Sequence, residues 1–419
     1  MGYLAKKLKT YGVVKCVAYF AGTIAYLIVK PIYKVCLSLF YRVAADKYLF
    51  LSNPSFSDNS KVLYNYMVQK SQSKGKYVWL IWKGDKIPSD REATTIFIRA
   101  DSYWHKGMTL RALKEIYTSQ VIFYTHRMPD GVKKRKGQKI INLWHGCGYK
   151  DTERKGKRSS WFDFALVPGE IFVGTKAKFW NCPEEKILPI GYPRFDLLKG
   201  ESKKAQEYAK NILGEASKLI IWLPTFRRTA YGIFPEEQIR RQFDLPLLTS
   251  LEEMKQLNSY CKEKEMVICL KRHPFQLKYS CEEMHFSHIH FIDNRDLEKN
   301  DVDLYSLLPY TDGLITDYSS VAVDYLLLDR PMAFILDDLT DYKNTRGFVF
   351  QDPTAYMPGK HVQNLEDLYA YLEEIWLGAD TFWEKRHQLL QVMHNPCENY
   401  CERILETLKK IQNNRKESD

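Results

Sequence analysis

The stretch Gly313-Leu-Ile-Thr-Asp-Tyr-Ser-Ser-Val-Ala-Val-Asp-Tyr-Leu-Leu-Leu-Asp-Arg-Pro331 predicts a short apolar strand, a polar turn and an amphipathic helix. Strands that alternate with helices in this way build parallel sheets. The first amides of a helix lack intrahelical partners and attract phosphate, although such a turn can also be an ordinary N-cap. We expect the turn to bind phosphate through Thr316, Asp317, Tyr318, Ser319 and Ser320.

Two histidines follow predicted strands in the same manner. His145 ends Ile-Asn-Leu-Trp-His, and His273 ends Cys-Leu-Lys-Arg-His. Ligands of open α/β sheets gather at the carboxyl ends of strands, so these histidines and the hydroxyl turn indicate a phosphate-handling enzyme with a histidine base. The alternative for each histidine is a hydrogen-bonded structural role.

Apolar strands and amphipathic helices alternate along most of the chain and form two sets joined near residues 200–215. This pattern predicts an α/β fold of two Rossmann-like domains with a cleft between them. His145 belongs to the first set, whereas Arg227, His273 and Ser319 belong to the second, so we expect a site that spans the cleft. The predicted segments are 1–50 (amphipathic helices), 51–205 (first domain), 206–378 (second domain) and 379–419 (C-terminal helices).

The net charge of +11 over 419 residues is concentrated in two places. Residues 1–50 contain seven lysines and one arginine against one aspartate, and residues 133–158 contain ten basic residues against two acidic ones. Two local basic patches predict two local anionic partners and speak against nucleic acid. The alternative for residues 133–158 is a solvated basic loop. Nine cysteines without regular spacing are typical of a reducing cytosol.

The N-terminal segment predicts an amphipathic helix. Residues 16–29 carry no charge, but they fall short of the ~20 residues that span a bilayer. Lysines and tyrosines form one stripe and aliphatic side chains the opposite face, which favours a helix lying in the membrane interface on the cytoplasmic side. Pro31 should kink or split it. The alternatives are a single span, a docked helix and a cleaved signal peptide. The residues expected at the membrane are Lys15, Phe20, Ile24, Leu27, Lys30 and Lys34.

Several short motifs occur in a characteristic order. They are Trp144-His145-Gly146, Gly191-Tyr-Pro-Arg194, Pro224-Thr225-Phe226-Arg227, Arg272-His273-Pro274, Thr316-Asp-Tyr-Ser-Ser320, Arg346-Gly-Phe-Val-Phe350 and Met357-Pro-Gly359. Over roughly residues 75–375 the chain resembles the teichoic acid CDP-glycerol glycerophosphotransferases. One motif departs, because that family usually continues Trp-His-Gly with Thr-Pro-Leu-Lys and this chain has Cys147-Gly-Tyr-Lys150.

The resemblance implies a GT-B-like arrangement, with residues 51–205 as the acceptor domain and 206–378 as the CDP-polyol domain. It implies a membrane-associated enzyme that transfers glycerol phosphate, or a related polyol phosphate, from CDP-glycerol. The acceptor is a hydroxyl of a polyprenyl-diphosphate-linked saccharide, and CMP is released. Glycerol or ribitol, and one added unit or many, stay open.

The chemistry assigns an expected role to each motif. An acceptor hydroxyl attacks phosphorus, and His145 is expected to remove its proton. The resemblance assigns this histidine to catalysis, and which histidine is the base stays open. His273 is expected to donate to the diphosphate or to departing CMP. Other expected substrate contacts are Gly146, Lys150, Thr225, Arg227 and Arg272, besides the turn at 316–320. No resident metal is expected, and Mg²⁺ on the donor diphosphate stays open.

Two other functions compete with this hypothesis. A GT-B glycosyltransferase using a sugar nucleotide would have the same fold. A basic protein that only binds membranes or nucleic acid would need no catalytic histidine, but its charge would not be confined to two patches.

Overall fold

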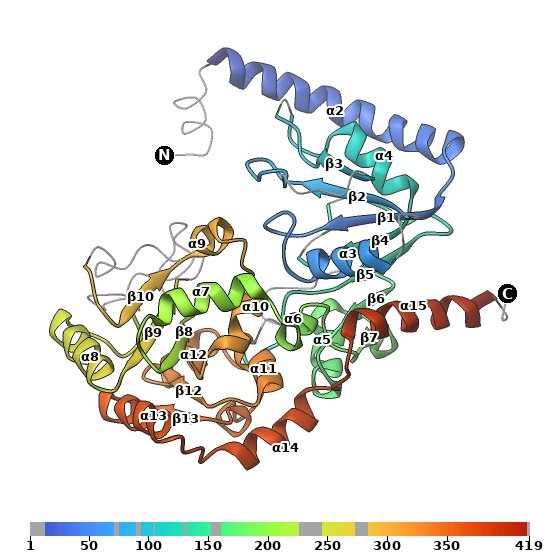
Figure 1. Cartoon of the computed structure of the whole chain (residues 1–419). Helices are drawn as coiled ribbons and strands as arrows, with labels where there is room; N and C mark the ends of the chain where they lie inside the picture. Colours follow the sequence, from blue (N-terminus) through green and yellow to red (C-terminus); the bar gives the residue numbers. More distant parts are fainter. Residues whose placement is uncertain are drawn as a thin grey trace.

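The computed structural model comprises two α/β lobes and a long N-terminal helix (Figure 1). It describes residues 13–70, 75–88, 94–103, 105–126, 128–129, 132–151, 161–225, 245–272 and 284–416. Two of the predicted site residues, Arg227 and His273, lie outside this described part.

The first lobe is built on a seven-stranded parallel sheet with the order β3-β2-β1-β4-β5-β6-β7. Its strands are β1 (Ala44–Leu51), β2 (Lys76–Ile81), β3 (Thr95–Arg99), β4 (Ser119–Tyr124), β5 (Lys139–Asn142), β6 (Phe164–Leu166) and β7 (Ile187–Leu188). Near-continuous apolar runs form these strands because helices cover both faces of the sheet.

The second lobe is built on a six-stranded parallel sheet with the order β10-β9-β8-β11-β12-β13. Its strands are β8 (Lys218–Leu223), β9 (Met266–Lys271), β10 (Ile289–Ile292), β11 (Gly313–Thr316), β12 (Met332–Ile335) and β13 (Lys360–Val362). In each lobe the order reverses beside the first strand, between β1 and β4 and between β8 and β11. Such switch points open a crevice at the carboxyl ends of the strands.

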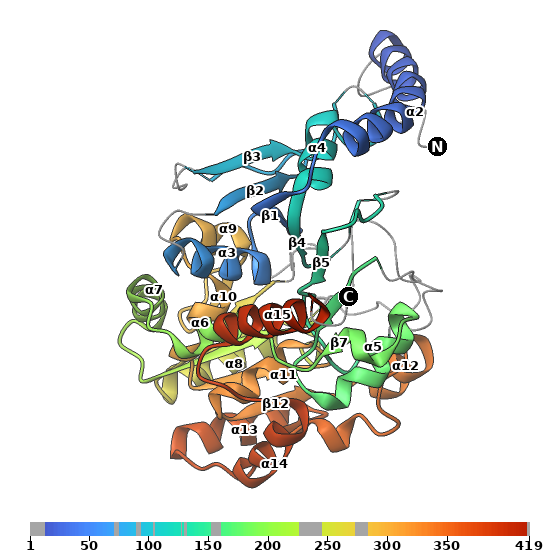
Figure 2. The ribbon, with the colours of Figure 1, turned by 90° about the vertical axis from the view of Figure 1, so that its right-hand side faces the viewer.

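Helices enclose both sheets (Figures 1 and 2). In the first lobe α3 (Asp58–Lys70) and α4 (Leu110–Thr118) lie on opposite faces. In the second lobe α8 (Leu251–Glu263) and α13 (Leu365–Leu377) cover the outer face. One apolar core runs from the first lobe to the inner face of the second sheet, and a smaller core lies under α8 and α13. The predicted α/β fold with two parallel sheets is confirmed.

Several elements differ from the sequence-based expectation. Strand β1 starts at Ala44, within the segment 1–50 that was expected to contain only helices, and α3 and β13 were not predicted at all. The apolar run Tyr48-Leu-Phe-Leu51 is short and directly follows Asp46 and Lys47, so it was included in the charged N-terminal segment. Of the two expectations for Pro31, a kink or a split, the split does not occur, because α2 (Val13–Phe40) continues through this residue as one helix.

Helix α2 packs on the first lobe with its tyrosine stripe. The ring of Tyr26, 5% exposed, stacks on the ring of His105 at 4.0 Å, and the amide of Lys106 donates to Thr23 Oγ1 at 3.0 Å. The opposite face of the helix is exposed on the side of the first lobe away from the second (Figure 1). It carries Val17, Phe20, Ile24, Leu27, Ile28, Ile32, Val35 and Leu39.

The predicted basic segment begins by holding the end of α2. Arg135 donates to the carbonyl oxygens of Ser38 at 3.1 Å and Tyr41 at 2.7 Å. Lys134 forms an ion pair with Asp163 at 2.5 Å. These two basic side chains therefore have structural roles.

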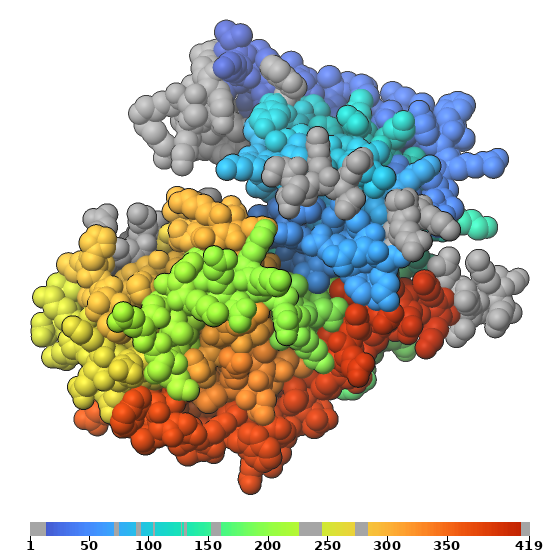
Figure 3. All heavy atoms as spheres, viewed as in Figure 1, coloured from blue at the N-terminus to red at the C-terminus, as the bar shows by residue number. Residues whose placement is uncertain are grey.

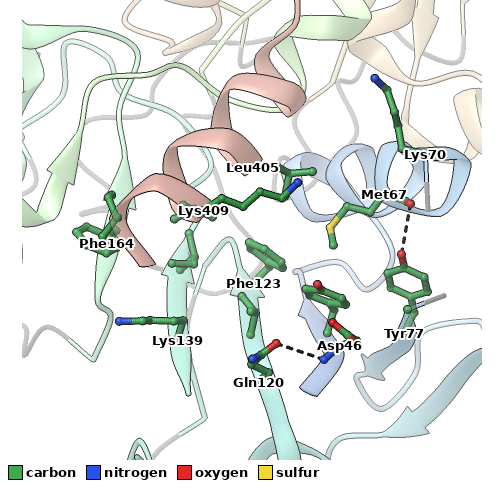
Figure 4. A pocket seen from close by; sticks show the side chains of 16 residues that line it. Asp46, Met67, Lys70, Tyr77, Gln120, Phe123, Lys139, Phe164, Leu405 and Lys409 are labelled. Atoms are coloured by element: carbon green, nitrogen blue, oxygen red, sulfur yellow. Dashed lines mark hydrogen bonds between the residues drawn. The ribbon is translucent and has the colours of Figure 1, made fainter. Parts of the chain in front are cut away.

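A cavity of about 440 Å³ lies between the first sheet, α3 and the C-terminal helix α15 (Tyr400–Lys416) (Figure 4). Its lining includes Asp46, Tyr77 and Lys139, which stand at the amino ends of their strands. His145 follows the carboxyl end of β5. This cavity therefore lies at the opposite end of the strands from the candidate site.

Candidate functional site

The backbone around His145 is held in an unusual conformation. Trp144 has φ of 55°, a left-handed value that is uncommon for a bulky residue and typical of constrained functional segments. Asn59 of α3 donates its side-chain amide to the Trp144 carbonyl at 2.9 Å, and the Trp144 amide donates to Asn142 Oδ1 at 2.9 Å. These bonds fix the direction in which the next residue leaves the strand.

The His145 imidazole lies between aromatic groups and a backbone carbonyl. Its ring stacks on His126 at 4.1 Å with an interplanar angle of 6°, and the Trp144 ring lies 4.0 Å away. His145 Nδ1 is 3.3 Å from the carbonyl oxygen of Thr125. In the tautomer with the proton on Nδ1, that nitrogen donates to Thr125, and Nε2 is free to accept a proton.

Electrostatics keep this imidazole neutral. Burial lowers the pKa of His145 well below its usual value, and the nearby His126 and Arg194 lower it further, whereas the bond to Thr125 opposes the shift. Burial also lowers the pKa of His126. A His145 that is neutral near pH 7 is in the form that a general base requires.

The predicted hydroxyl turn stands at the switch point of the second sheet, but its first three side chains are buried. Asp317 accepts the backbone amide of Thr225 at 2.9 Å, Thr316 Oγ1 donates to the Leu223 carbonyl at 2.8 Å, and the Tyr318 hydroxyl donates to Asp338 at 3.0 Å. These contacts join the ends of β8 and β11. The side chains of Thr316, Asp317 and Tyr318 thus bond to protein groups and stabilise the conformation of the turn.

Ser319 and Ser320 are the half-buried residues of the turn. They precede α11 (Val321–Tyr325), which has only five residues and continues as a 3₁₀ turn to Leu328. The expected helix over 320–328 is therefore present in a shorter α-helical form. A phosphate here would depend on the first amides and the two hydroxyls more than on a long helix dipole.

The loop of His145 lies directly against this turn. A Cβ atom added to Gly146, whose φ is 135°, would stand 2.7 Å from Ser320 Oγ. One added to Gly148 would stand 2.8 Å from Ser320 Cα. Glycine at both positions lets the two lobes approach closely.

The same loop continues along the second lobe. Tyr149 accepts the amide of Val349 at 2.8 Å, and the amide of Asp151 donates to the Gly347 carbonyl at 3.0 Å. Lys150 forms an antiparallel β-bridge with Phe348. The motifs at 147–150 and 346–350 are thus neighbours in space, although about 200 residues separate them in the sequence.

Sequence reasoning did not include Arg194 among the site residues. Its side chain is 4% exposed and donates to the carbonyl of His145 at 2.9 Å. It also forms ion pairs with Asp58 of the first lobe at 3.0 Å and Asp324 of the second at 2.6 Å. The motif Gly191-Tyr-Pro-Arg194 was the available signal. Nothing in the sequence indicated Asp58 or His126 as neighbours of the site.

Two cationic residues lie at the end of β9, the predicted site residue Arg272 and its neighbour Lys271. Arg272 pairs with Asp293 at 3.0 Å. Lys271 donates to Asn294 at 2.8 Å, and burial lowers its pKa to about 8. Both side chains already contact protein groups, so any contact with substrate would be shared with these partners.

Comparisons with known proteins show the family and the fold of this chain. The sequence profile of the CDP-glycerol:poly(glycerophosphate) glycerophosphotransferases matches residues 33–408. The teichoic acid ribitol-phosphate polymerases TarL and TarK of Staphylococcus aureus are 27% and 28% identical over 77% of this chain, and they match over 55% and 60% of their own lengths. The teichoic acid ribitol-phosphate primase of Bacillus spizizenii is 27% identical over 80% of this chain and 84% of its own.

The chain thus spans little more than half the length of the two polymerases. Among solved structures, the wall teichoic acid polymerase TagF superposes with a TM-score of 0.71 at 20% identity, over 96% of this chain and 98% of that one. At this identity the likeness concerns the fold. Because the profile match extends over most of the sequence, the chain belongs to the CDP-glycerol:poly(glycerophosphate) glycerophosphotransferase family.

Proposed function

We propose that this protein transfers a polyol phosphate from a CDP-polyol to an acceptor hydroxyl and releases CMP. The contact of Gly146 and Gly148 with Ser320 supports this proposal, because it brings the loop that follows His145, whose pKa is lowered by burial, against the hydroxyl turn of the other lobe. Some relatives are named for glycerol phosphate and others for ribitol phosphate, so CDP-glycerol and CDP-ribitol are the two candidate donors. A TagF structure soaked with CDPG has the same fold.

The proposed reaction is a substitution at phosphorus. The acceptor oxygen bonds to the phosphorus that carries the polyol, the bond from that phosphorus to the CMP oxygen breaks, and the acceptor proton passes to His145 Nε2. The amides and hydroxyls of Ser319 and Ser320 hold the diphosphate. Phosphoryl transfer depends mainly on positioning and on charge stabilisation, which fits a site in which two lobes each supply one half.

We also propose that the acceptor is lipid-linked and that α2 holds the enzyme at the cytoplasmic face of the membrane. The helix is long and apolar enough to cross a membrane, and only 11% of its apolar window is buried. Its tyrosines pack inward, so the aliphatic face is left for the lipid interface. Lys30, Lys34 and Lys133 lie near one another, since the charges of Lys30 and Lys133 help to lower the pKa of Lys34. Such a group favours anionic lipids.

A donor panel tests this function. The purified protein is incubated with a polyprenyl-diphosphate disaccharide acceptor and, separately, with CDP-glycerol, CDP-ribitol and UDP-sugars, and nucleotide release and product mass are measured. We expect CMP and a product heavier by one or more polyol phosphates. Release of UDP with a sugar added to the acceptor would instead identify a glycosyltransferase.

A further inference from the structure

One buried arginine joins three parts of the candidate site. The guanidinium of Arg194 donates through Nη1 to the His145 carbonyl and to Asp58, and through Nη2 to Asp324. Its own backbone amide donates to Asn59 Oδ1 at 3.0 Å, and Asn59 in turn holds the Trp144 carbonyl. Arg194 therefore holds the backbone of His145 directly through its guanidinium, and the backbone of Trp144 indirectly through Asn59.

The second-lobe end of this network lies next to the hydroxyl turn. Asp324 is in α11, one helical turn after Ser320, and is fully buried. The hydroxyl of Tyr305 also donates to Asp324, and the Arg194 guanidinium lies 4.5 Å from the Tyr305 ring. One guanidinium thus links α11 directly to the first lobe.

We propose that Arg194 is a positioning residue that sets the spacing between His145 and the Ser319–Ser320 turn. The inference rests on the proposed function for its kinetic consequence. The positioning role itself is independent of the proposed function, because the Arg194 side chain contacts both the carbonyl of His145 and the helix that follows the turn.

A lysine cannot reproduce these contacts. The guanidinium offers several donors in one rigid plane, whereas an ammonium is a single point charge on a flexible stem. In Arg194→Lys the charge is kept, but a single nitrogen replaces the two nitrogens that bond the three acceptors, so we expect at least one of these contacts to be lost. We expect the protein to fold and the relative position of His145 and Ser320 to become looser.

The chain offers a matched control in Arg386. This arginine is also buried, at 1% exposure, and also bonds two aspartates, Asp380 at 2.7 Å and Asp329 at 3.2 Å. All three residues lie at the outer side of the second lobe, on or near α14 (Trp383–Met393). Arg386→Lys therefore reports the general effect of weakening a buried arginine network.

The experiment compares the two lysine variants by CMP release and by NMR of ¹³C-labelled histidine, with His145→Gln used to assign the resonance. For Arg194→Lys we expect kcat to fall by about 10²-fold, as for misplaced reacting groups, with a smaller change in the donor KM and a changed His145 pKa. Arg386→Lys should leave kcat, the donor KM and the His145 pKa unchanged. Added guanidinium ion should partly restore kcat of Arg194→Ala.

Two results overturn the inference: an unchanged His145 resonance and pKa in Arg194→Lys, or an equal loss of kcat in both lysine variants at equal loss of melting temperature. If the wild type releases no CMP from any CDP-polyol, the proposed function fails. The NMR comparison still decides the positioning role in that case.

Discussion

At the scale of single residues, burial lowers the pKa of two histidines, His145 and His394, and keeps both neutral. His145 is surrounded by His126, Trp144 and a carbonyl at the candidate site. His394, near the C-terminal end of α14, donates to the Val323 carbonyl at 2.7 Å. Its Nδ1 is buried without a hydrogen-bond partner. Protonation has a different consequence at each position.

For His145 the consequence is catalytic. Its lowered pKa means that the basic form persists as the pH falls below 6.5, so the acid limb of kcat/KM should lie below that ordinary histidine value. The measurement is CMP release between pH 5 and pH 8. A limb centred at or above 6.5 would show that another group, or a solvated imidazole, controls the rate.

For His394 the consequence is stability. Burial lowers its pKa to about 4, whereas the unfolded chain binds the proton near pH 6.5, so its stabilising contribution is complete above that pH and is lost as the pH falls. Between pH 7 and pH 5 this loss is on the order of 2 kcal/mol. Urea unfolding at both pH values should show a shallower pH dependence in His394→Gln. An equal slope in both proteins would exclude His394 as the titrating group.

At the scale of elements, two features besides His145 are proposed to bind a partner. The turn before α11 would bind the donor diphosphate, and the exposed face of α2 would bind the membrane. The sequence predicted both elements because a polar turn after an apolar strand and a tyrosine stripe opposite aliphatic residues are local patterns. It did not predict that Tyr318 and Asp317 point inward, since their partners Asp338 and Thr225 come from other loops.

Removing the two hydroxyls of the turn should weaken donor binding. In the double variant Ser319→Ala and Ser320→Ala we expect KM for the CDP-polyol to rise by roughly tenfold, the order expected from losing one or two hydrogen bonds to a charged group. Thr316, which is buried and bonded to the Leu223 carbonyl, serves as the control position. An unchanged KM and kcat in the double variant would remove the turn from the donor site.

Charging the exposed face of α2 should release the protein from membranes. Leu27 is 63% exposed on α2, and Leu377, at the end of α13, is 65% exposed and provides a matched leucine. We expect Leu27→Glu, combined with Ile24→Glu, to shift the protein to the supernatant in vesicle sedimentation, because burying a carboxylate among lipid tails is costly. Leu377→Glu should sediment like the wild type. Retention of the α2 variant on vesicles would show that α2 is not the anchor.

At the scale of the whole molecule, the two lobes and the helix α15 form one unit (Figure 3). The chain returns to the first lobe at its C-terminal end, where Asp196 accepts the amides of Tyr400 and Cys401 at 2.6 and 2.9 Å. The alternation of strands and helices predicted two parallel sheets, because strands that are buried on both faces are recognisable in the local sequence as apolar runs. The return of α15, and the Arg194 bridge over 130 residues to Asp324, depend on contacts that no local pattern encodes.

Single-turnover release of CMP from a CDP-polyol by His145→Ala tests the central claim most directly, with His387→Ala, at a partly exposed position on α14, as the control. The account predicts a loss of ~10²-fold or more for His145→Ala, with normal folding and with His387→Ala like the wild type. Near-normal release by His145→Ala would contradict it, because the proton would then leave the acceptor without this imidazole.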